Sequence, residues 1–263
     1  MPKVILGDNP FFGISHLTPE KSYEYLKDTE RFDKAASIIN AAEGIGIDTF
    51  MVSSHSDTRE LLEAAGYGTN AVLPDICLVV PNVHKVNEHA AAKGLVGALK
   101  SLFSDGLNFS NLRPRQLYRR IVMGDIVYPK TKYVALHNVV VDMLVGLHGH
   151  RALSLFCRVT RLFGFKPVLI TLNPVRLMSL GIQCSAVCCY YNARGYNMCD
   201  TPEAMLKTFE ESPEVEEIWA MGILASGAVS YDEISDDALL NSFTRVIVAS
   251  SRLDRIEEMR RLF

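Results

Sequence analysis

Eight short apolar runs, separated by longer amphipathic stretches, constrain the fold of this chain more than any other feature of its sequence. The runs are rich in β-branched residues and apolar throughout, without alternation. Strands that are covered on both faces have this pattern. The expected strands are residues 3–7, 49–54, 76–81, 133–138, 167–172, 186–191, 217–222 and 245–250.

The intervening stretches have helical periodicity and carry helix start and stop signals. Residues 201–212, for example, begin with Thr-Pro-Glu, which is a favourable start for a helix. The expected helices are residues 33–46, 57–68, 87–105, 114–125, 143–164, 174–181, 201–212, 235–243 and 252–263.

Eight strand-then-helix units in 263 residues predict an α/β fold of the (β/α)8 TIM-barrel type. A doubly wound open sheet is the second possibility, since alternation alone does not prove closure. No linker or low-complexity segment is present, so we expect one domain, residues 1–263. Side chains that follow the carboxyl ends of the strands are then the candidate functional residues.

Composition excludes several classes of function. The net charge of −3 and the pI near 6.2 show no excess of positive charge that would favour binding to nucleic acid or an acidic membrane. No apolar run reaches the ~18 residues of a membrane span, and the N-terminal residues do not resemble a signal peptide. Six cysteines without a CxxC pair predict reduced thiols in a cytoplasmic protein. We expect a small-molecule ligand, and the sequence does not indicate an oligomeric state.

Polar residues follow three of the first four expected strands. Asp8 and Asn9 follow the first strand, His55 follows the second, and His137 and Asn138 end the fourth. One interpretation is an acid–base pair of His55 and His137, with Asp8 orienting one of them and the asparagines contacting substrate. The other interpretation is structural: Asp8 precedes Asn-Pro in a turn, and each histidine packs in the core.

A metal site is a second chemical possibility at these strand ends. Asp8, His55, His84 and His137 could converge, and imidazole and carboxylate groups suit zinc, iron or manganese. No HxH or HExxH spacing supports a metal, so we favour the metal-free version.

The last expected strand leads into a possible anion site. Ser250, Ser251 and Arg252 precede the helix 252–263, and Ser251 with Asp254 three residues later is a plausible cap. The N–H groups at a helix N-terminus attract phosphate, and arginine can add a bidentate contact. Ser226, beside Gly227 after the seventh strand, could approach the same ligand. A plain helix cap with solvated arginines is the alternative.

The sixth expected strand ends in two tyrosines and an asparagine. We assign Tyr191 and Asn192 to substrate binding at the mouth of the barrel. Cys188 and Cys189 alternate faces within this strand, and we expect both to be inert buried thiols.

Four segments resemble the aldo-keto reductase family. Leu224, Ala225 and Gly227 match a Pro-Leu-Ala-x-Gly turn of the family's seventh strand, and residues 245–263 are similar to its eighth strand and cofactor-binding helix. Residues 46–66 have the outline of the second-strand segment. The run YVALHN is similar to the fourth strand, which ends in the family's catalytic histidine.

The resemblance implies a barrel that reduces a carbonyl with NADP(H). His137 would be the retained catalytic histidine. Asn173, at the end of the fifth strand, would contact the nicotinamide, and Ser226, Ser250, Ser251 and Arg252 would hold the rest of the cofactor. The family's other catalytic residues are replaced: Met51 stands for Asp, His55 or Ser56 for Tyr, and Pro81 or Asn82 for Lys.

Three functional hypotheses follow. The first is an NAD(P)-linked oxidoreductase that acts on a small polar carbonyl or phosphorylated ligand. The second is a non-redox lyase, isomerase or hydrolase that uses Asp8, His55 and His137, with or without a metal. The third is a catalytically inactive barrel that binds a ligand.

Overall fold

The computed structural model describes residues 1–14, 27–81 and 130–263, and it contains a closed barrel of eight parallel strands in sequence order. Strand β8 pairs with β1, with Val4 opposite Val246 and Leu6 opposite Val248, so the open doubly wound sheet is excluded. The strands are β1 (Lys3–Gly7), β2 (Thr49–Ser53), β3 (Asp75–Val80), β4 (Thr131–Leu136), β5 (Lys166–Thr171), β6 (Cys184–Tyr190), β7 (Val215–Met221) and β8 (Arg245–Val248).

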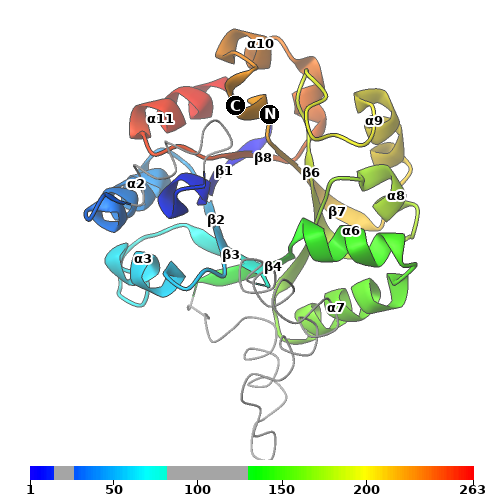
Figure 1. Cartoon of the computed structure of the whole chain (residues 1–263), viewed down its shortest axis with the longest axis horizontal. Helices are drawn as coiled ribbons and strands as arrows, with labels where there is room; N and C mark the ends of the chain where they lie inside the picture. Colours follow the sequence, from blue (N-terminus) through cyan, green and yellow to red (C-terminus); the bar gives the residue numbers. More distant parts are fainter. Residues whose placement is uncertain (15–26, 82–129) are drawn as a thin grey trace, which may run out of the picture.

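Helices surround the barrel on the outside, as the view along its axis shows (Figure 1). In the described part of the chain they are α2 (Arg31–Gly44), α3 (Thr58–Ala64), α6 (Asn138–Gly146), α7 (His150–Leu162), α8 (Pro174–Met178), α9 (Pro202–Glu210), α10 (Tyr231–Ser235) and α11 (Leu253–Leu262), with 3-10 turns η1 (Asn9–Phe12), η3 (Ala225–Gly227) and η4 (Ala238–Ser242). The helices expected at 87–105 and 114–125 lie outside the described residues.

Two expected helices were wrong in their extent. The single helix expected at 143–164 is two helices, α6 and α7, because His148 adopts a left-handed φ of 57° and interrupts the helical backbone. The helix expected at 235–243 is only the 3-10 turn η4 (Ala238–Ser242), and the α-helix of this segment, α10, lies before it and ends at Ser235. The Thr-Pro-Glu start is confirmed, because the Thr201 side chain accepts a hydrogen bond from the Ala204 N–H at 3.3 Å.

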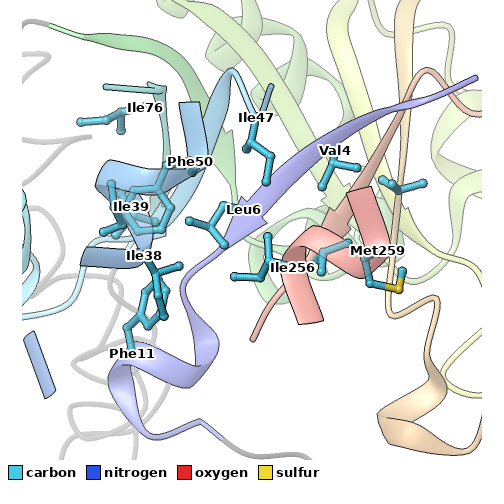
Figure 2. Packing of buried hydrophobic residues seen from close by; sticks show 14 of the residues in the cluster. Val4, Leu6, Phe11, Ile38, Ile39, Ile47, Phe50, Ile76, Ile256 and Met259 are labelled. Carbon is cyan, nitrogen blue, oxygen red and sulfur yellow. The ribbon is translucent and has the colours of Figure 1, made fainter. Parts of the chain in front are cut away.

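The core has an inner and an outer layer. The inner layer fills the barrel and includes Ile5, Tyr133, Val168, Ala186 and Trp219. The outer layer lies between the barrel wall and the helices, where Leu6 and Phe50 turn toward Ile39 of α2 and Ile256 of α11 (Figure 2). Each such side chain stabilises the fold by about 2 kcal/mol on burial. Both faces of the strands are therefore covered, which explains their unbroken apolar sequence.

An ionic cluster closes the N-terminal end of the barrel. Arg245, the first residue of β8, is 7% exposed and donates to Glu217 at 2.8 Å and to Asp48 at 2.7 Å. The Trp219 indole N–H also donates to Glu217, at 2.9 Å. Burial opposes the ionisation of Glu217, but the hydrogen bonds from Trp219 and Arg245 outweigh it and lower its pKa. The charges are thus neutralised locally, as buried ions require.

No helix within residues 1–14, 27–81 and 130–263 is both long enough and apolar enough to cross a membrane.

Candidate active site

A cavity of about 910 Å³ lies at the carboxyl ends of the strands. This size is within the range typical of small-molecule sites. Apolar side chains from five of the strands contribute to its lining: Met51, Val79, Ile170, Met221 and Ile247. Polar groups come from the residues that follow the strands. The cavity therefore combines a poorly hydrated wall with a few polar side chains, as expected for a site that binds and orients a small ligand.

Asp8 is the one carboxylate among the described residues that line this cavity. Strand β1 ends at Gly7, and Asp8 follows directly, 4% exposed. The Ser53 N–H at the end of β2 donates to Asp8 Oδ2 at 2.6 Å. Burial raises the pKa of Asp8 from 3.8 to about 6, and the hydrogen bonds from Ser53 limit the rise. The carboxyl group can therefore exchange a proton near neutral pH.

His137 lines the cavity from the end of β4. The strand ends at Leu136, two residues earlier than expected, and His137 is the N-cap of α6. Its Nδ1 accepts the Val139 N–H at 3.2 Å, and its own backbone N–H donates to the Val80 carbonyl at 2.8 Å. Because Nδ1 is an acceptor, the neutral imidazole carries its proton on Nε2.

His55 lines the same cavity, two residues beyond the end of β2. Its ring packs against Phe12, with 5.0 Å between the centroids and an interplanar angle of 34°. Its Nδ1 accepts the Asp57 N–H at 3.3 Å, so its neutral form also carries the proton on Nε2. The structure thus brings Asp8, His55 and His137 to one cavity, together with Asn9 and Asn138.

The proposed metal ligands do not form a recognisable centre in the described part of the chain. No group of three or more His, Cys, Asp or Glu side chains within it could hold a metal ion. His84, the fourth residue of the metal hypothesis, lies outside the described residues.

The expected anion-binding residues line the side of the cavity that follows β7 and β8. They are Ser226 on η3 and Ser250, Ser251 and Arg252 before α11. Ala225 and Ser226 have left-handed φ angles of 44° and 57°, an uncommon conformation for residues other than glycine. The expected Ser251–Asp254 cap is wrong: the N-cap residue is Arg252, and no side chain caps the helix. Arg252 instead pairs with Asp254 through a short contact.

Three expected site residues are not among those that line the cavity. Asn173 is the N-cap of α8 and accepts the Arg176 N–H at 3.0 Å. Tyr191 faces away from the barrel axis, and its hydroxyl lies 3.0 Å from both carboxylate oxygens of Asp237. Asn192 is 1% exposed and bridges its own loop, through hydrogen bonds of 2.9 Å to the backbone of Tyr196. All three therefore have structural roles in this structure.

Tyr190 is the residue of β6 that lines the cavity, and the sequence reasoning missed it. In the structure Ala186 and Cys188 belong to the inner layer, so Tyr190 faces inward and Tyr191 outward, but the sequence of this strand, apolar on both faces, gave no signal for that register. Tyr196, in the following loop, lines the cavity as well. Cys188 and Cys189 are both buried, and burial raises the pKa of each thiol, which agrees with the expectation of inert cysteines.

The positions of the reductase tetrad carry different chemistry here. Met51 and Pro81, which stand for the family's Asp and Lys, both line the cavity with apolar surfaces. Asn82, the other candidate for the Lys position, lies outside the described residues. A phenol tuned by a neighbouring lysine and aspartate is therefore not formed from the described residues.

No protein-family model matches this sequence, and no curated protein matches it. Among solved structures, the chain is similar to two described as a "putative aldo-keto reductase" from Pseudomonas aeruginosa. The first is 14% identical, with a TM-score of 0.56 over 98% of this chain and 88% of that chain. The second is 13% identical, with a TM-score of 0.54 over 98% and 89%. At such identities the likeness shows an aldo-keto-reductase-like barrel fold.

Proposed function

We propose that this chain is an enzyme that transfers a proton at a carbon next to a carbonyl group of a small anionic substrate, as an isomerase or lyase. The observation that carries the proposal is Asp8, a buried carboxylate whose pKa of about 6 suits proton exchange at neutral pH. It lies at the end of a barrel strand, where such enzymes hold their catalytic groups.

In this reaction the Asp8 carboxylate accepts the proton from the carbon. The electron pair of the broken C–H bond forms a C=C bond, and the carbonyl π pair moves onto the oxygen. Nε2–H of His137 donates a hydrogen bond to that oxygen, because Nδ1 already accepts the Val139 N–H. A neutral imidazole at a helix N-terminus is a known electrophile for such an oxygen. Return of the proton to a different atom completes an isomerisation without oxidant or metal.

The anionic part of the substrate would lie at the other side of the cavity. Arg252 and Arg255 line that side with Ser250 and Ser251, and α11 begins there. A helix N-terminus and guanidinium groups together favour a phosphate or carboxylate. His55, beside Asp8, adds a hydrogen-bond donor for a substrate hydroxyl or carbonyl oxygen.

The test is hydrogen exchange into candidate substrates. The protein would be incubated in D2O with three-carbon hydroxy-carbonyl compounds, each with and without a phosphate group, and NMR would follow loss of the C–H signals. We expect exchange with a phosphorylated compound. Asp8→Asn should reduce the rate by about 10²- to 10⁴-fold, as for loss of a general base.

His137→Asn is the second variant. Asparagine retains the N-cap hydrogen bond to the helix but removes the Nε2–H, so stability should stay within about 0.5 kcal/mol while exchange falls. Tyr191→Phe, outside the cavity, is the matched control and should exchange at the wild-type rate. Wild-type protein that exchanges no C–H of any compound in this panel would contradict the proposal.

NAD(P)-linked carbonyl reduction is the second candidate. It is supported by the continuous cavity, which joins His137 to Gly222, Ser226 and the segment before α11. Reduction would also need a proton donor in place of the family's tyrosine. Titration with NADPH and with NADH, followed by cofactor fluorescence, tests it: saturable binding favours the reductase, and no binding at millimolar cofactor removes it.

A further inference from the structure

Tyr190 presents its phenol ring to the barrel axis. It is the last residue of β6, and Ala186 and Cys188, four and two positions earlier, belong to the layer that fills the barrel. Side chains two apart in a strand share a face. Tyr190 accordingly lines the cavity, whereas Cys189, one position earlier, belongs to the outer layer.

Gly222 fixes the position of this ring. It follows β7, adjacent to β6, where Tyr190 is opposite Met221. Its φ is +70°, and a Cβ at this position would lie 2.5 Å from Cδ1 of Tyr190. The ring therefore packs directly on the glycine backbone, at a position where a side chain would both clash and strain the backbone.

The loop that follows also fastens this end of β6. Asn192 hydrogen-bonds the backbone of Tyr196 at 2.9 Å, and Arg194 pairs with Glu233 of α10 at 2.6 Å. The loop after Tyr190 is thus anchored, so the ring is held by its surroundings without any contribution from its own hydroxyl.

The Tyr190 hydroxyl accepts and donates no hydrogen bond within residues 1–14, 27–81 and 130–263, although the side chain is partly buried. Burial, with smaller contributions from Cys188 and Tyr196, raises its pKa. The phenol therefore stays protonated at neutral pH and is a donor. A tyrosine that is rigidly held, partly buried and lines a cavity is suited to donate to a ligand oxygen.

We propose that Tyr190 donates a hydrogen bond to the substrate oxygen that becomes negatively charged, across the cavity from Asp8. This assignment rests on the proposed proton-transfer function and adds a second donor for the oxygen that His137 contacts. Preorganised donors at such an oxygen stabilise the charge as it develops. Tyr190 would bind the substrate and take no proton from it.

The test uses oxalate, a planar dianion that resembles an enolate with two oxygens. Isothermal titration calorimetry would compare the oxalate affinity of the wild-type protein with that of Tyr190→Phe and of Tyr191→Phe. We expect millimolar or tighter binding by the wild type and at least about tenfold weaker binding by Tyr190→Phe, as for loss of a hydrogen bond to a charged group. Tyr191→Phe should bind oxalate like the wild type.

Gly222→Ala provides an independent perturbation. The added methyl group displaces the Tyr190 ring but leaves its hydroxyl group in place on the side chain. Gly222→Ala should weaken oxalate binding as Tyr190→Phe does. The unfolding midpoint of Tyr190→Phe should equal that of the wild type, which checks that this variant is folded. Equal oxalate affinity in wild type and Tyr190→Phe, or no binding by the wild type at millimolar oxalate, would overturn the assignment.

The two proposals fail separately. If deuterium exchange occurs and depends on Asp8 while Tyr190→Phe changes neither exchange nor oxalate affinity, the proton-transfer function stands and the role of Tyr190 is wrong. If oxalate binding depends on Tyr190 but no C–H exchanges, the ligand contact stands and the proton-transfer function is wrong.

Discussion

Asp8 destabilises the protein in its ionised form. A carboxylate that is 4% exposed loses most of its hydration, and the hydrogen bonds from Ser53 replace only part of it. Its pKa is therefore raised on folding, from 3.8 to about 6. For an acid with a raised pKa, the folded state binds the proton more tightly than the unfolded state. The stabilisation is complete below the lower pKa and is lost as pH rises through the higher one.

Asp8→Asn should abolish this pH dependence. Between pH 3.8 and about 6 the free energy of unfolding of the wild type should fall relative to that of the variant, by up to about 3 kcal/mol. The Asn side chain can still accept the Ser53 N–H, so the local structure is retained. Urea denaturation at a series of pH values measures the difference. Parallel curves for the two proteins over this range would show that Asp8 has an ordinary pKa.

Single residues were predictable from the sequence where their position followed from a strand end. Asp8, His55 and His137 were placed at the mouth because each follows an apolar run, and all three line the cavity. The choice between Tyr190 and Tyr191 depended on which face of β6 points inward. In a strand that is apolar on both faces, the sequence carries no alternation from which to read that register.

At the scale of single elements, the connection between α6 and α7 shows how local backbone geometry overrides a helical pattern. Residues 143–164 have helical periodicity, but His148 is left-handed and Gly149 becomes the N-cap of α7. A Cβ on Gly149 would lie 2.9 Å from Cδ2 of Leu144 and 3.2 Å from its carbonyl oxygen. The chain therefore turns at this point, and α6 and α7 lie beside each other, both against β5 (Figure 1).

Two glycine substitutions in this region should have opposite effects. Gly146→Ala, in the last turn of α6 with no atom within 4 Å of the new Cβ, should stabilise the protein by about 0.5–1 kcal/mol. Gly149→Ala should destabilise it, because Leu144 must move. Thermal unfolding followed by circular dichroism compares them. Stabilisation by both substitutions would show that the close approach at Gly149 relaxes without cost.

The strands were more predictable than the helices, and a simple physical reason explains the difference. All eight expected strands are present, with ends displaced by one or two residues, because burial on both faces leaves an unmistakable apolar run. Closure could not be predicted, since it depends on the pairing of β1 with β8, two strands at opposite ends of the sequence. A regular alternation of strands and helices fits the open sheet equally well.

At the scale of the whole molecule, the two ends of the barrel have opposite characters. The C-terminal end holds a cavity of about 910 Å³, whereas Arg245, Glu217 and Asp48 close the N-terminal end. The first half of each strand thus contributes to stability, and the residues after it contribute to the site. This division is typical of (β/α)8 barrels.

Arg245→Met should be strongly destabilising, because it leaves Glu217 and Asp48 without their buried partner. Removal of one member of such a cluster costs about 3–5 kcal/mol. Lys3→Met is the matched control: Lys3 pairs with the same Asp48, but its side chain is 67% exposed, so the change should stay below about 1 kcal/mol. Urea denaturation measures both. Equal, small effects would mean that the cluster contributes little to stability.

The ionic cluster at the N-terminal end of the barrel also prevents a ligand from passing through the barrel. The rings of Trp219 and Tyr133 pack edge to face, with 5.1 Å between their centroids, next to the ion pairs. They belong to the inner layer, so the axis of the barrel is filled below the cavity. A ligand must enter and leave through the same opening. Under the proposed function, substrate and product would share this one cavity, and product should therefore inhibit competitively.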